Sequence, residues 1–394
     1  MPTRVVGVEE GKASATGAAI ANGSTRTNSP VKAFPFRFLQ LFFLFLLVFL
    51  GISLASLHTV KYFGSPNVAP QVARSIIRPC LEEPTSLERW IRPPSSLLHT
   101  MNDAQLLWRA SFAPRVKKYP FKRVRKIAFM FLTKGPLPLS PLWERFFKGH
   151  QKLYSIYIHS LPFYVADFPP SSVFYRRQIP SKIAEWGRMS MCDAERRLLA
   201  NALLDVGNEW FILLSESCIP LHNFSVIYHY LSRSRFSFVS AFDEPGIIGR
   251  GRYNESLAPE VNLTNWRKGS QWFEVNRELA VKMVEDTVYY PKFKKFCKPP
   301  CYVDEHYFQT LLSIKTPHLI ANRSVTFVDW SRGGAHPAMF GDADIQGDFF
   351  RKLFESRTCV YNNQPSALCF LFARKFTPNA LGRLLNVSSE IFGF

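Results

Sequence analysis

Residues 210–217 have the sequence WFILLSES, a short apolar run that ends in polar side chains. KIAFMFLT at 126–133 and YSIYIH at 154–159 have the same character. Short apolar runs bounded by charged or turn-forming residues are typical of strands buried on both faces. Stretches with helical spacing, at 140–150 and 190–206, separate the three runs. This alternation predicts an α/β sandwich around a mostly parallel sheet.

Further local patterns extend this prediction. Residues 222–234 have helical spacing, and FSFVSAF at 236–242 indicates another strand. Ser190 and Asp193 have the spacing of a capping box at the start of the second predicted helix. In open parallel sheets, ligands bind beyond the carboxyl ends of the strands. We therefore expect ligand contacts where three strands end, at Thr133, His159, Ser215, Glu216 and Ser217.

Residues 38–60 contain no Asp, Glu, Lys or Arg, and these 23 residues are enough to cross a bilayer. A cleaved signal peptide usually has an apolar core of about 7–15 residues nearer the N-terminus, so an uncleaved anchor is favoured. Arg26, Lys32 and Arg37 precede the stretch closely, whereas only Lys61 follows it closely. The positive-inside rule therefore predicts a single-pass type II membrane protein.

Four parts are expected along the chain. Residues 1–37 form a cytosolic tail, residues 38–60 the signal anchor, and residues 123–394 a luminal domain. Between them, residues 61–122 contain several prolines and end in a basic cluster, which is typical of a stem. The cluster is either a solvated extended segment or a contact for an acidic glycan or a neighbouring protein.

Glycosylation sequons and cysteines agree with a luminal body. All seven cysteines lie beyond the anchor, where disulfides persist, and their odd number leaves one thiol free or paired with another chain. A net charge of +19 would otherwise suggest nucleic acid as a partner, but a luminal body would not meet it. Five sequons follow the anchor, at Asn223, Asn254, Asn262, Asn322 and Asn386.

Two adjacent carboxylates, Asp304 and Glu305, precede a helical pattern in CYVDEHYFQTLLSI. Acids at a helix start commonly cap amides and complement the helix dipole, and this structural role competes with a catalytic one. Cys297 and Cys301 could staple the loop that holds them. No further ligands stand at zinc-site spacing, so no metal is expected at these cysteines.

Arg357 and Lys375 are cations beside apolar runs near the C-terminus. Such charges usually solvate the ends of strands or helices, but two cations in one cleft could bind a diphosphate. Many sugar-nucleotide enzymes place Asp-x-Asp after a buried strand to hold a divalent cation, whereas WFILLSES ends without it. The sole Asp-x-Asp, at 342–344, follows a loop containing Gly and Pro. We therefore expect no metal or other cofactor, with Arg and Lys in the place of a cation.

The chain resembles the core-2/I-branching β-1,6-N-acetylglucosaminyltransferase family, glycosyltransferase family 14, in its plant-type members. The resemblance runs from about Lys126 to Lys375. It rests on several segments that are specific together, whereas any single segment would be weak evidence. These segments are WFILLSESCIPL, GSQWFEVNR (269–277), CYVDEHYFQTLL, TFVDWSRGGAHP (326–337) and LFARKF.

This resemblance implies a Golgi type II enzyme with a GT-A-like, Rossmann-type fold and inverting chemistry without a required metal. It implies a UDP-sugar donor, with N-acetylglucosamine favoured, and a glycan or glycoprotein acceptor, such as a plant cell-wall polysaccharide or proteoglycan. Glu305 corresponds to the general base. Arg357 and Lys375 correspond to the cations that stabilise the departing nucleoside diphosphate. Trp272 is expected to line the sugar or acceptor pocket, or else to lie in the core.

Two departures from the family pattern leave the donor open. His159 stands where animal members have Asp, and the spacing between Arg357 and Lys375 is shorter than theirs. Transfer of glucuronic acid or xylose is therefore an alternative to N-acetylglucosamine. A second class of function is a non-catalytic luminal protein that binds glycans on the same fold.

Overall fold

The structure is a computed structural model that describes residues 36–62, 87, 91–115, 118–355 and 358–394. The chain divides into two units, Met1–Glu83 and Pro84–Phe394.

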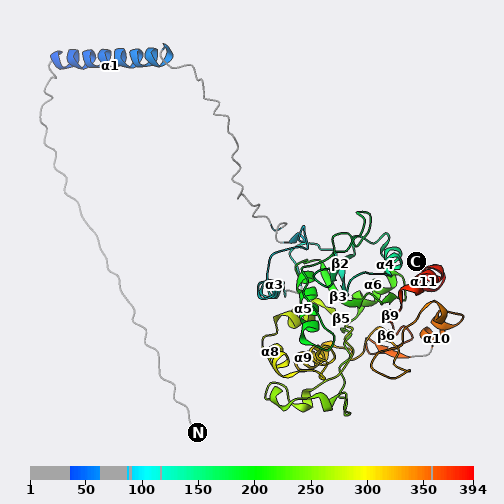
Figure 1. The fold of residues 1–394 in the computed structure, drawn as a ribbon. Helices are drawn as coiled ribbons and strands as arrows, with labels where there is room; N and C mark the ends of the chain where they lie inside the picture. The colour runs from blue at the N-terminus through cyan, green and yellow to red at the C-terminus, as the bar shows by residue number, and fades with distance from the viewer. Residues whose placement is uncertain (1–35, 63–86, 88–90, 116–117, 356–357) are drawn as a thin grey trace, which may run out of the picture. The chain divides into compact units, whose positions relative to one another are not determined.

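The first unit contains helix α1 (Phe36–Tyr62), drawn in blue in Figure 1. Its segment Leu39–Thr59 has 21 residues and a mean hydropathy of 2.4, and none of it is buried. Among the described residues, this is the one helix long and apolar enough to cross a membrane. The apolar helix predicted at 38–60 is confirmed, while its use as an anchor stays a prediction.

A four-stranded sheet forms the centre of the second unit, with the order β2-β1-β3-β5. Its strands are β1 (Lys126–Leu132), β2 (Tyr154–His159), β3 (Asn208–Ser215) and β5 (Glu274–Asn276). The first three run parallel, and β5 pairs antiparallel with β3. The predicted α/β class with a mostly parallel sheet is therefore confirmed.

The three parallel strands end at the same level. Leu132, the last residue of β1, pairs with His159 on one side and with Ser215 on the other. Residues that follow these positions consequently lie along one edge of the sheet. This register places Thr133 and Glu216 near one another despite their separation in sequence.

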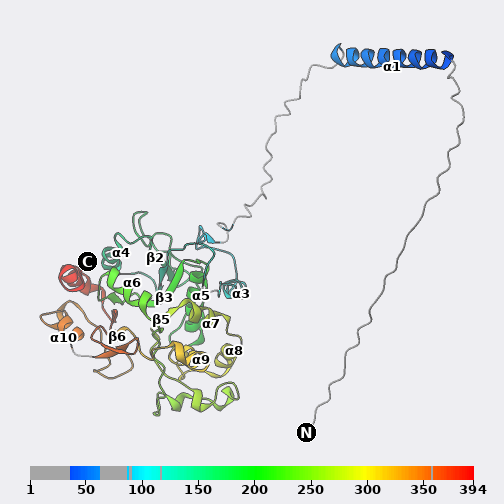
Figure 2. The same ribbon diagram turned by 180° about the vertical axis from the view of Figure 1, so that it is seen from behind.

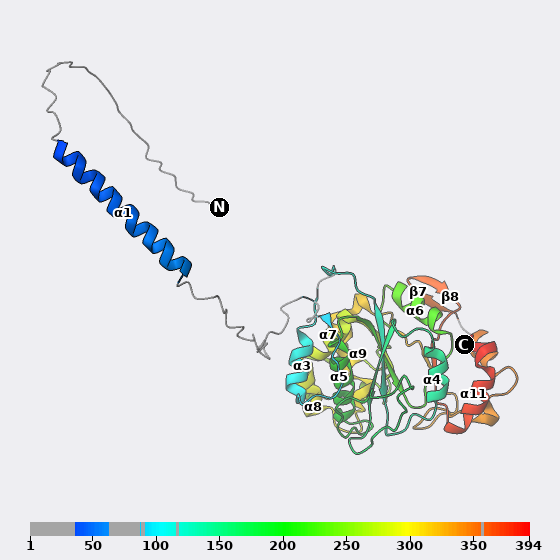
Figure 3. The same cartoon turned by 90° about the horizontal axis from the view of Figure 1, so that it is seen from above.

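Helices cover both faces of the sheet, as Figure 3 shows. On one face Ala128 and Met130 of β1 share a core with the helices α3, α5, α7 and α9. On the other face Phe129 and Phe131 pack with α4, α6 and the C-terminal segment. Alternating side chains of β1 therefore enter two separate cores, which explains why its sequence is apolar throughout. The bounds of these helices are α3 (Asp103–Ser111), α4 (Ser140–Phe147), α5 (Met189–Leu203), α6 (Phe224–Arg233), α7 (Arg277–Glu285), α9 (Tyr307–Lys315) and α11 (Leu381–Val387).

A smaller sheet with the order β4-β9-β6 flanks the central one. It consists of β4 (Ile219–Pro220), β9 (Phe372–Arg374) and β6 (Thr326–Val328). In Figures 1 and 2, β6 lies between β5 and helix α10 (Phe349–Glu355). Because β9 runs parallel to β6, the chain after β9 leaves the sheet on the same side as the chain after β6.

The remaining described elements are short. They are the helix α8 (Tyr289–Phe296), the hairpin β7 (Cys359–Tyr361) and β8 (Gln364–Ser366), the 3₁₀ turns η1 (Arg250–Arg252), η2 (Glu255–Leu257), η3 (Leu263–Asn265), η4 (Val303–Glu305), η5 (Pro317–Leu319), η6 (Asp342–Asp344) and η7 (Pro378–Ala380), and the π-helical turn η8 (Ser388–Phe392).

Two local predictions are wrong. Residues 236–242 form single-residue bridges to Ile320, Glu274 and Lys268 rather than a continuous strand. The Ser190 hydroxyl does not cap α5, because it accepts a hydrogen bond from the backbone N–H of Glu185 at 3.0 Å instead. Both segments have the expected residue types, but the backbone beside each segment forms different hydrogen bonds from the ones predicted.

Cysteines form two disulfides, Cys297–Cys301 and Cys359–Cys369. Cys192 and Cys218 are free and buried, and Cys80 lies outside the described residues. The suggested staple at 297–301 is therefore present.

Helix α3, within the segment expected to be a stem, packs against α5 through Leu106 and Ala110 and through an ion pair between Asp103 and Arg197.

Candidate active site

A cavity of about 730 Å³ lies at the carboxyl ends of β1 and β3. Thr133 directly follows β1, and Ser215 ends β3, so the register of the sheet brings both to this edge. The loop at 268–272 and the segment 323–337, which contains β6, supply further walls. The lining includes six residues predicted from the sequence: Thr133, Ser215, Glu216, Trp272, Glu305 and Lys375.

Other predicted contacts lie elsewhere. Arg357 lies outside the described residues. His159 and Ser217 are buried and are not among the residues that line the cavity in the described chain. Burial lowers the pKa of His159 to about 3, and its Nε2 accepts a hydrogen bond from the backbone N–H of Lys182. His159 is therefore neutral and supports a loop instead of contacting a ligand.

The turn η4 ends at Glu305, before α9 begins at Tyr307. The sequence predicts that Asp304 and Glu305 begin the helix. In the structure they form a separate 3₁₀ turn before α9. The backbone N–H of Gly269 donates to the carbonyl oxygen of Glu305 at 2.9 Å. This bond joins the turn to the neighbouring loop at 268–272, which also lines the cavity.

Two cations hold the side chain of Glu305. Arg252 Nη1 lies 2.8 Å and Lys268 Nζ 3.2 Å from Glu305 Oε2. The guanidinium of Arg252 is itself packed over the ring of Tyr302, with its central carbon 4.4 Å from the ring centroid. The carboxylate is therefore fixed in direction while it remains partly accessible from the cavity.

Asp304 has a different environment. Only 2% of it is exposed, and Oδ1 has no hydrogen-bond partner among the described residues. Burial raises the pKa of Asp304 to about 6, and the negative charge of Glu305 raises it further while Arg252 and Lys268 oppose the shift. Asp304 also lines the cavity, but because it is almost fully buried, Glu305 is the more accessible of the two carboxyl groups.

A third acid, Glu195 on α5, lies behind the cavity wall. It is fully buried, and the amide Nε2 of Gln271 donates to its Oε1 at 2.7 Å. Burial raises the pKa of Glu195 well above its usual value, although the bond from Gln271 counteracts this. The sequence contained a signal for this burial, because Glu195 has helical spacing to the apolar Leu198 and Leu199.

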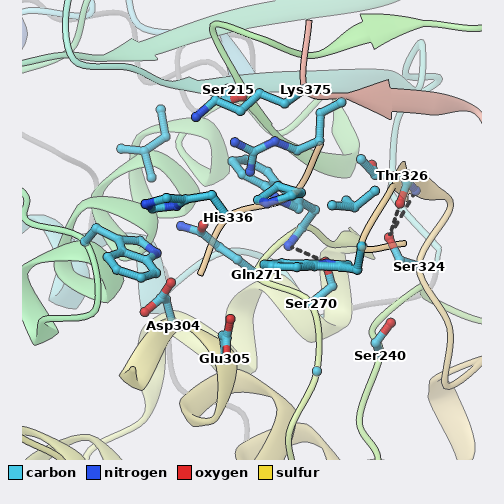
Figure 4. A pocket seen from close by; sticks show the side chains of 18 of the residues that line it. Ser215, Ser240, Ser270, Gln271, Asp304, Glu305, Ser324, Thr326, His336 and Lys375 are labelled. Carbon is cyan, nitrogen blue, oxygen red and sulfur yellow. Dashed lines mark hydrogen bonds between the residues drawn. The ribbon is translucent and has the colours of Figure 1, made fainter. Parts of the chain in front are cut away.

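Figure 4 shows Lys375 beside Ser215, across the cavity from Asp304 and Glu305. Burial lowers the pKa of Lys375, and the positive charges of Arg374 and Lys134 add to the shift while Glu216 opposes it. The cavity is therefore polarised: one end has the carboxylate Glu305 paired with two cations, and the other has cations without an ion pair in the described chain.

Trp272 and Arg374 also form part of the cavity wall, and Arg374 directly precedes Lys375 in the chain. Trp272 is only 6% exposed, yet it lines the cavity, so it belongs both to the core and to the site. The guanidinium carbon of Arg374 lies 4.1 Å from the centroid of the Trp272 ring. Arg374 also lines the cavity and was not predicted from the sequence.

The Asp-x-Asp motif lies outside the cavity lining and forms η6. Asp342 pairs with Arg383 at 3.7 Å and Asp344 with Arg332 at 3.6 Å. Across the described ranges, no group of three or more His, Cys, Asp or Glu side chains is placed to hold a metal ion.

Four of the predicted glycosylation sites, Asn254, Asn262, Asn322 and Asn386, are exposed. Asn223 is half-buried and caps α6, because its side-chain oxygen accepts a hydrogen bond from the backbone N–H of Val226. The exposed positions are therefore better placed to carry a glycan than Asn223.

Comparison with known proteins identifies the class of this fold and site. The family model of Core-2/I-Branching enzymes matches residues 127–354, which include the central sheet and Glu305. The chain therefore belongs to the core-2/I-branching enzyme family, a family of glycosyltransferases. A similar protein is Glycosyltransferase BC10 of rice, Oryza sativa subsp. japonica, which is 36% identical over 309 residues. That alignment covers 67% of this chain and 76% of the rice protein.

Proposed function

We propose that this protein is an inverting glycosyltransferase that moves a sugar from a UDP-sugar to a hydroxyl of a glycan or glycoprotein without a metal ion. The observation that carries the proposal is the polarised cavity. Glu305 is fixed at one end, and Lys375 lies at the other, with room between them for a sugar nucleotide.

In the proposed reaction, Glu305 accepts the proton of the acceptor hydroxyl. The acceptor oxygen attacks the anomeric carbon from the face opposite the phosphate, and the bond between that carbon and the phosphate oxygen breaks. Attack from the opposite face inverts the anomeric configuration, as in inverting hydrolases that use a carboxylate base. UDP leaves with the bonding electrons, and nearby cations stabilise its charge.

Lys375 is proposed to stabilise the departing diphosphate. It is half-buried, so its charge is screened less than that of a surface lysine. Arg357 is proposed for the same role from the family resemblance and lies outside the described residues. Thr133, Ser215 and Glu216 stand at the strand ends and are proposed to contact the nucleotide or sugar.

N-acetylglucosamine is the favoured donor sugar, and glucuronic acid and xylose are the alternatives. The favoured sugar rests on the resemblance of the sequence segments, since the matched family is described only as Core-2/I-Branching enzyme and the rice relative is named only as a glycosyltransferase.

We further propose a single-pass type II protein of the Golgi membrane, with α1 as its anchor. The unburied apolar segment Leu39–Thr59 supports an anchor, and the basic residues before it support a cytosolic N-terminus. Residues 1–37 would form the tail, 61–122 the stem and 123–394 the luminal transferase domain, with α3 of the stem segment packed onto that domain through α5. Protease protection in intact vesicles would test the orientation: an epitope at the C-terminus should survive, and one at the N-terminus should be removed.

The experiment for the activity uses the full-length protein in detergent, with UDP-GlcNAc, UDP-glucuronic acid and UDP-xylose. Binding is measured with EDTA and again with Mn²⁺, and the anomeric configuration of the released sugar is followed by NMR. We expect one donor to bind in EDTA and to release sugar with inverted configuration. Binding only with Mn²⁺ would exclude the metal-independent mechanism, and no binding at all would favour a non-catalytic glycan-binding protein.

A further inference from the structure

We propose that Arg374 binds the diphosphate of the donor, together with Lys375 and Lys134. This inference rests on the proposed function, because it assigns a ligand group to a residue of the same cavity.

The position of Arg374 is set by the small sheet. Arg374 is the last residue of β9 and pairs with Val328 of β6, while Ala373 pairs with Ile219 of β4. Strands on both sides therefore fix the backbone at this point. The next residue, Lys375, lines the cavity as well, so two consecutive cations reach the same space.

The side chain of Arg374 is placed without an acidic partner. Its guanidinium packs on Trp272, and its buried Nε has no hydrogen-bond partner among the described residues. A guanidinium on an aromatic face keeps its in-plane N–H groups free for a planar or tetrahedral anion. The two terminal nitrogens of Arg374 form no hydrogen bond within the described chain and are not buried, so their N–H groups are the ones open to a phosphate in the cavity.

The charges of the cavity point to the chemistry of the ligand. At one end, Arg252 and Lys268 are both paired with Glu305. At the other end, Arg374, Lys375 and Lys134 form no ion pair within the described ranges, and Glu216 is the carboxylate in their electrostatic neighbourhood. Three cations and one carboxylate leave this end with a net positive charge.

A diphosphate matches this excess better than a single carboxylate does. Each of its two phosphates carries negative charge and presents several acceptor oxygens, whereas the carboxylate of a uronic acid would offset only one cation. An arginine can bind two phosphate oxygens at once, and a lysine adds a point charge. Arg374 and Lys375 together are therefore suited to the group that becomes the leaving group.

The test compares UDP with UMP, because only UDP has the second phosphate. Full-length protein and its Arg374→Gln and Arg374→Lys variants are titrated with both nucleotides in EDTA, and thermal unfolding reports whether each variant folds. We expect Arg374→Gln to weaken UDP binding by about 10- to 100-fold and UMP binding by less than about 3-fold. Arg374→Lys should lie between the parent and Arg374→Gln, because it keeps the charge and loses the two-pronged geometry.

A control variant and a third ligand distinguish diphosphate binding from a structural role and from carboxylate binding. Arg383→Gln removes an exposed arginine outside the cavity lining and should leave both affinities unchanged. Equal loss for UDP and UMP, or no loss for either, would overturn the inference in favour of a structural role for Arg374 against Trp272. Loss confined to UDP-glucuronic acid would assign Arg374 to a carboxylate and overturn the diphosphate. If the folded parent binds no nucleotide, the proposed function itself fails. If the parent binds UDP tightly and Arg374→Gln binds it equally well, only this inference fails.

Discussion

Arg252 Nη1 lies 2.8 Å from Glu305 Oε2, although 53 residues separate the two in sequence. Arg252 belongs to a 3₁₀ turn in the loop that follows residue 242, and Glu305 ends another turn just before α9. The direction of the proposed base is thus set by a loop from a different part of the chain. Local sequence around Glu305 could not reveal this.

Removal of Arg252 should therefore impair turnover more than donor binding. In Arg252→Gln, Lys268 alone would hold Glu305, and we expect kcat to fall by about 10-fold because the carboxylate loses its orientation. The donor Kd should change little, since Arg252 is not among the residues that line the cavity in the described chain. Arg250→Gln is the matched control, because Arg250 pairs with Asp243 at the surface. Equal losses in the two variants would contradict the positioning role.

Gly269 should tolerate no side chain. A Cβ at this position would collide with the backbone carbonyl oxygen of Ser240, and the Gly269 N–H donates to the carbonyl of Glu305. Gly269→Ala must therefore displace the wall of the cavity, and we expect kcat/KM to fall by about 100-fold. Gly382→Ala is the control, because nothing lies within 4 Å of its added Cβ. An active Gly269→Ala protein would show that this contact does not position Glu305.

The disulfide Cys297–Cys301 closes a short loop directly before the turn that holds Glu305. Replacement of both cysteines by serine should lower the free energy of unfolding by about 2 kcal/mol through loop entropy and should also reduce turnover. The double replacement of Cys359 and Cys369, which is the other described disulfide, serves as the comparison. If both double variants lose stability and turnover falls no further without Cys297–Cys301 than without Cys359–Cys369, the Cys297–Cys301 disulfide does not support the site.

Glu274 predicts a pH dependence of stability. It is fully buried on β5, the Thr326 hydroxyl donates to its Oε1 at 2.9 Å, and burial raises its pKa to about 8. A raised pKa means that the folded state holds the proton more tightly than the unfolded state. Its contribution to stability is therefore fully present below about pH 4.5 and is lost as pH rises through about 8.

Glu274→Gln removes this titration. The variant should resemble the parent at pH 5 and be more stable at pH 9, by at most about 3–5 kcal/mol, as measured by denaturant unfolding. Parallel stability curves for parent and variant between these pH values would show that Glu274 does not titrate as described.

The sequence predicts the central strands well because their apolar character is local. β1, β2 and β3 are buried on both faces, so runs such as KIAFMFLT identify them without knowledge of their neighbours. Residues 236–242 are similarly apolar, but they form only isolated bridges to three different segments and no continuous ladder within the described chain. Whether such a segment becomes a strand depends on the backbone beside it.

The candidate site shows the same division. Glu305 and Lys375 follow from the family segments that contain them. The rule that ligands bind at the carboxyl edge gives Thr133, Ser215 and Glu216, which line the cavity, but it fails for His159 and Ser217, which are buried and do not line it in the described chain. Arg252 and Arg374 follow from neither, because their importance depends on Glu305 and Trp272, which are distant in sequence and near in space. Glu195 is intermediate, since its helical spacing indicated a buried position but not its hydrogen bond with Gln271.

The most direct test of the account is a comparison of full-length parent and Glu305→Gln for donor binding and for sugar transfer or donor hydrolysis, both in EDTA. Gln keeps the size of the side chain and removes its capacity to accept a proton. We expect the variant to bind the UDP-sugar within about 3-fold of the parent and to lose about 10²–10⁴-fold in turnover. Turnover within about 10-fold of the parent, with binding unchanged, would contradict the assignment of Glu305 as the base.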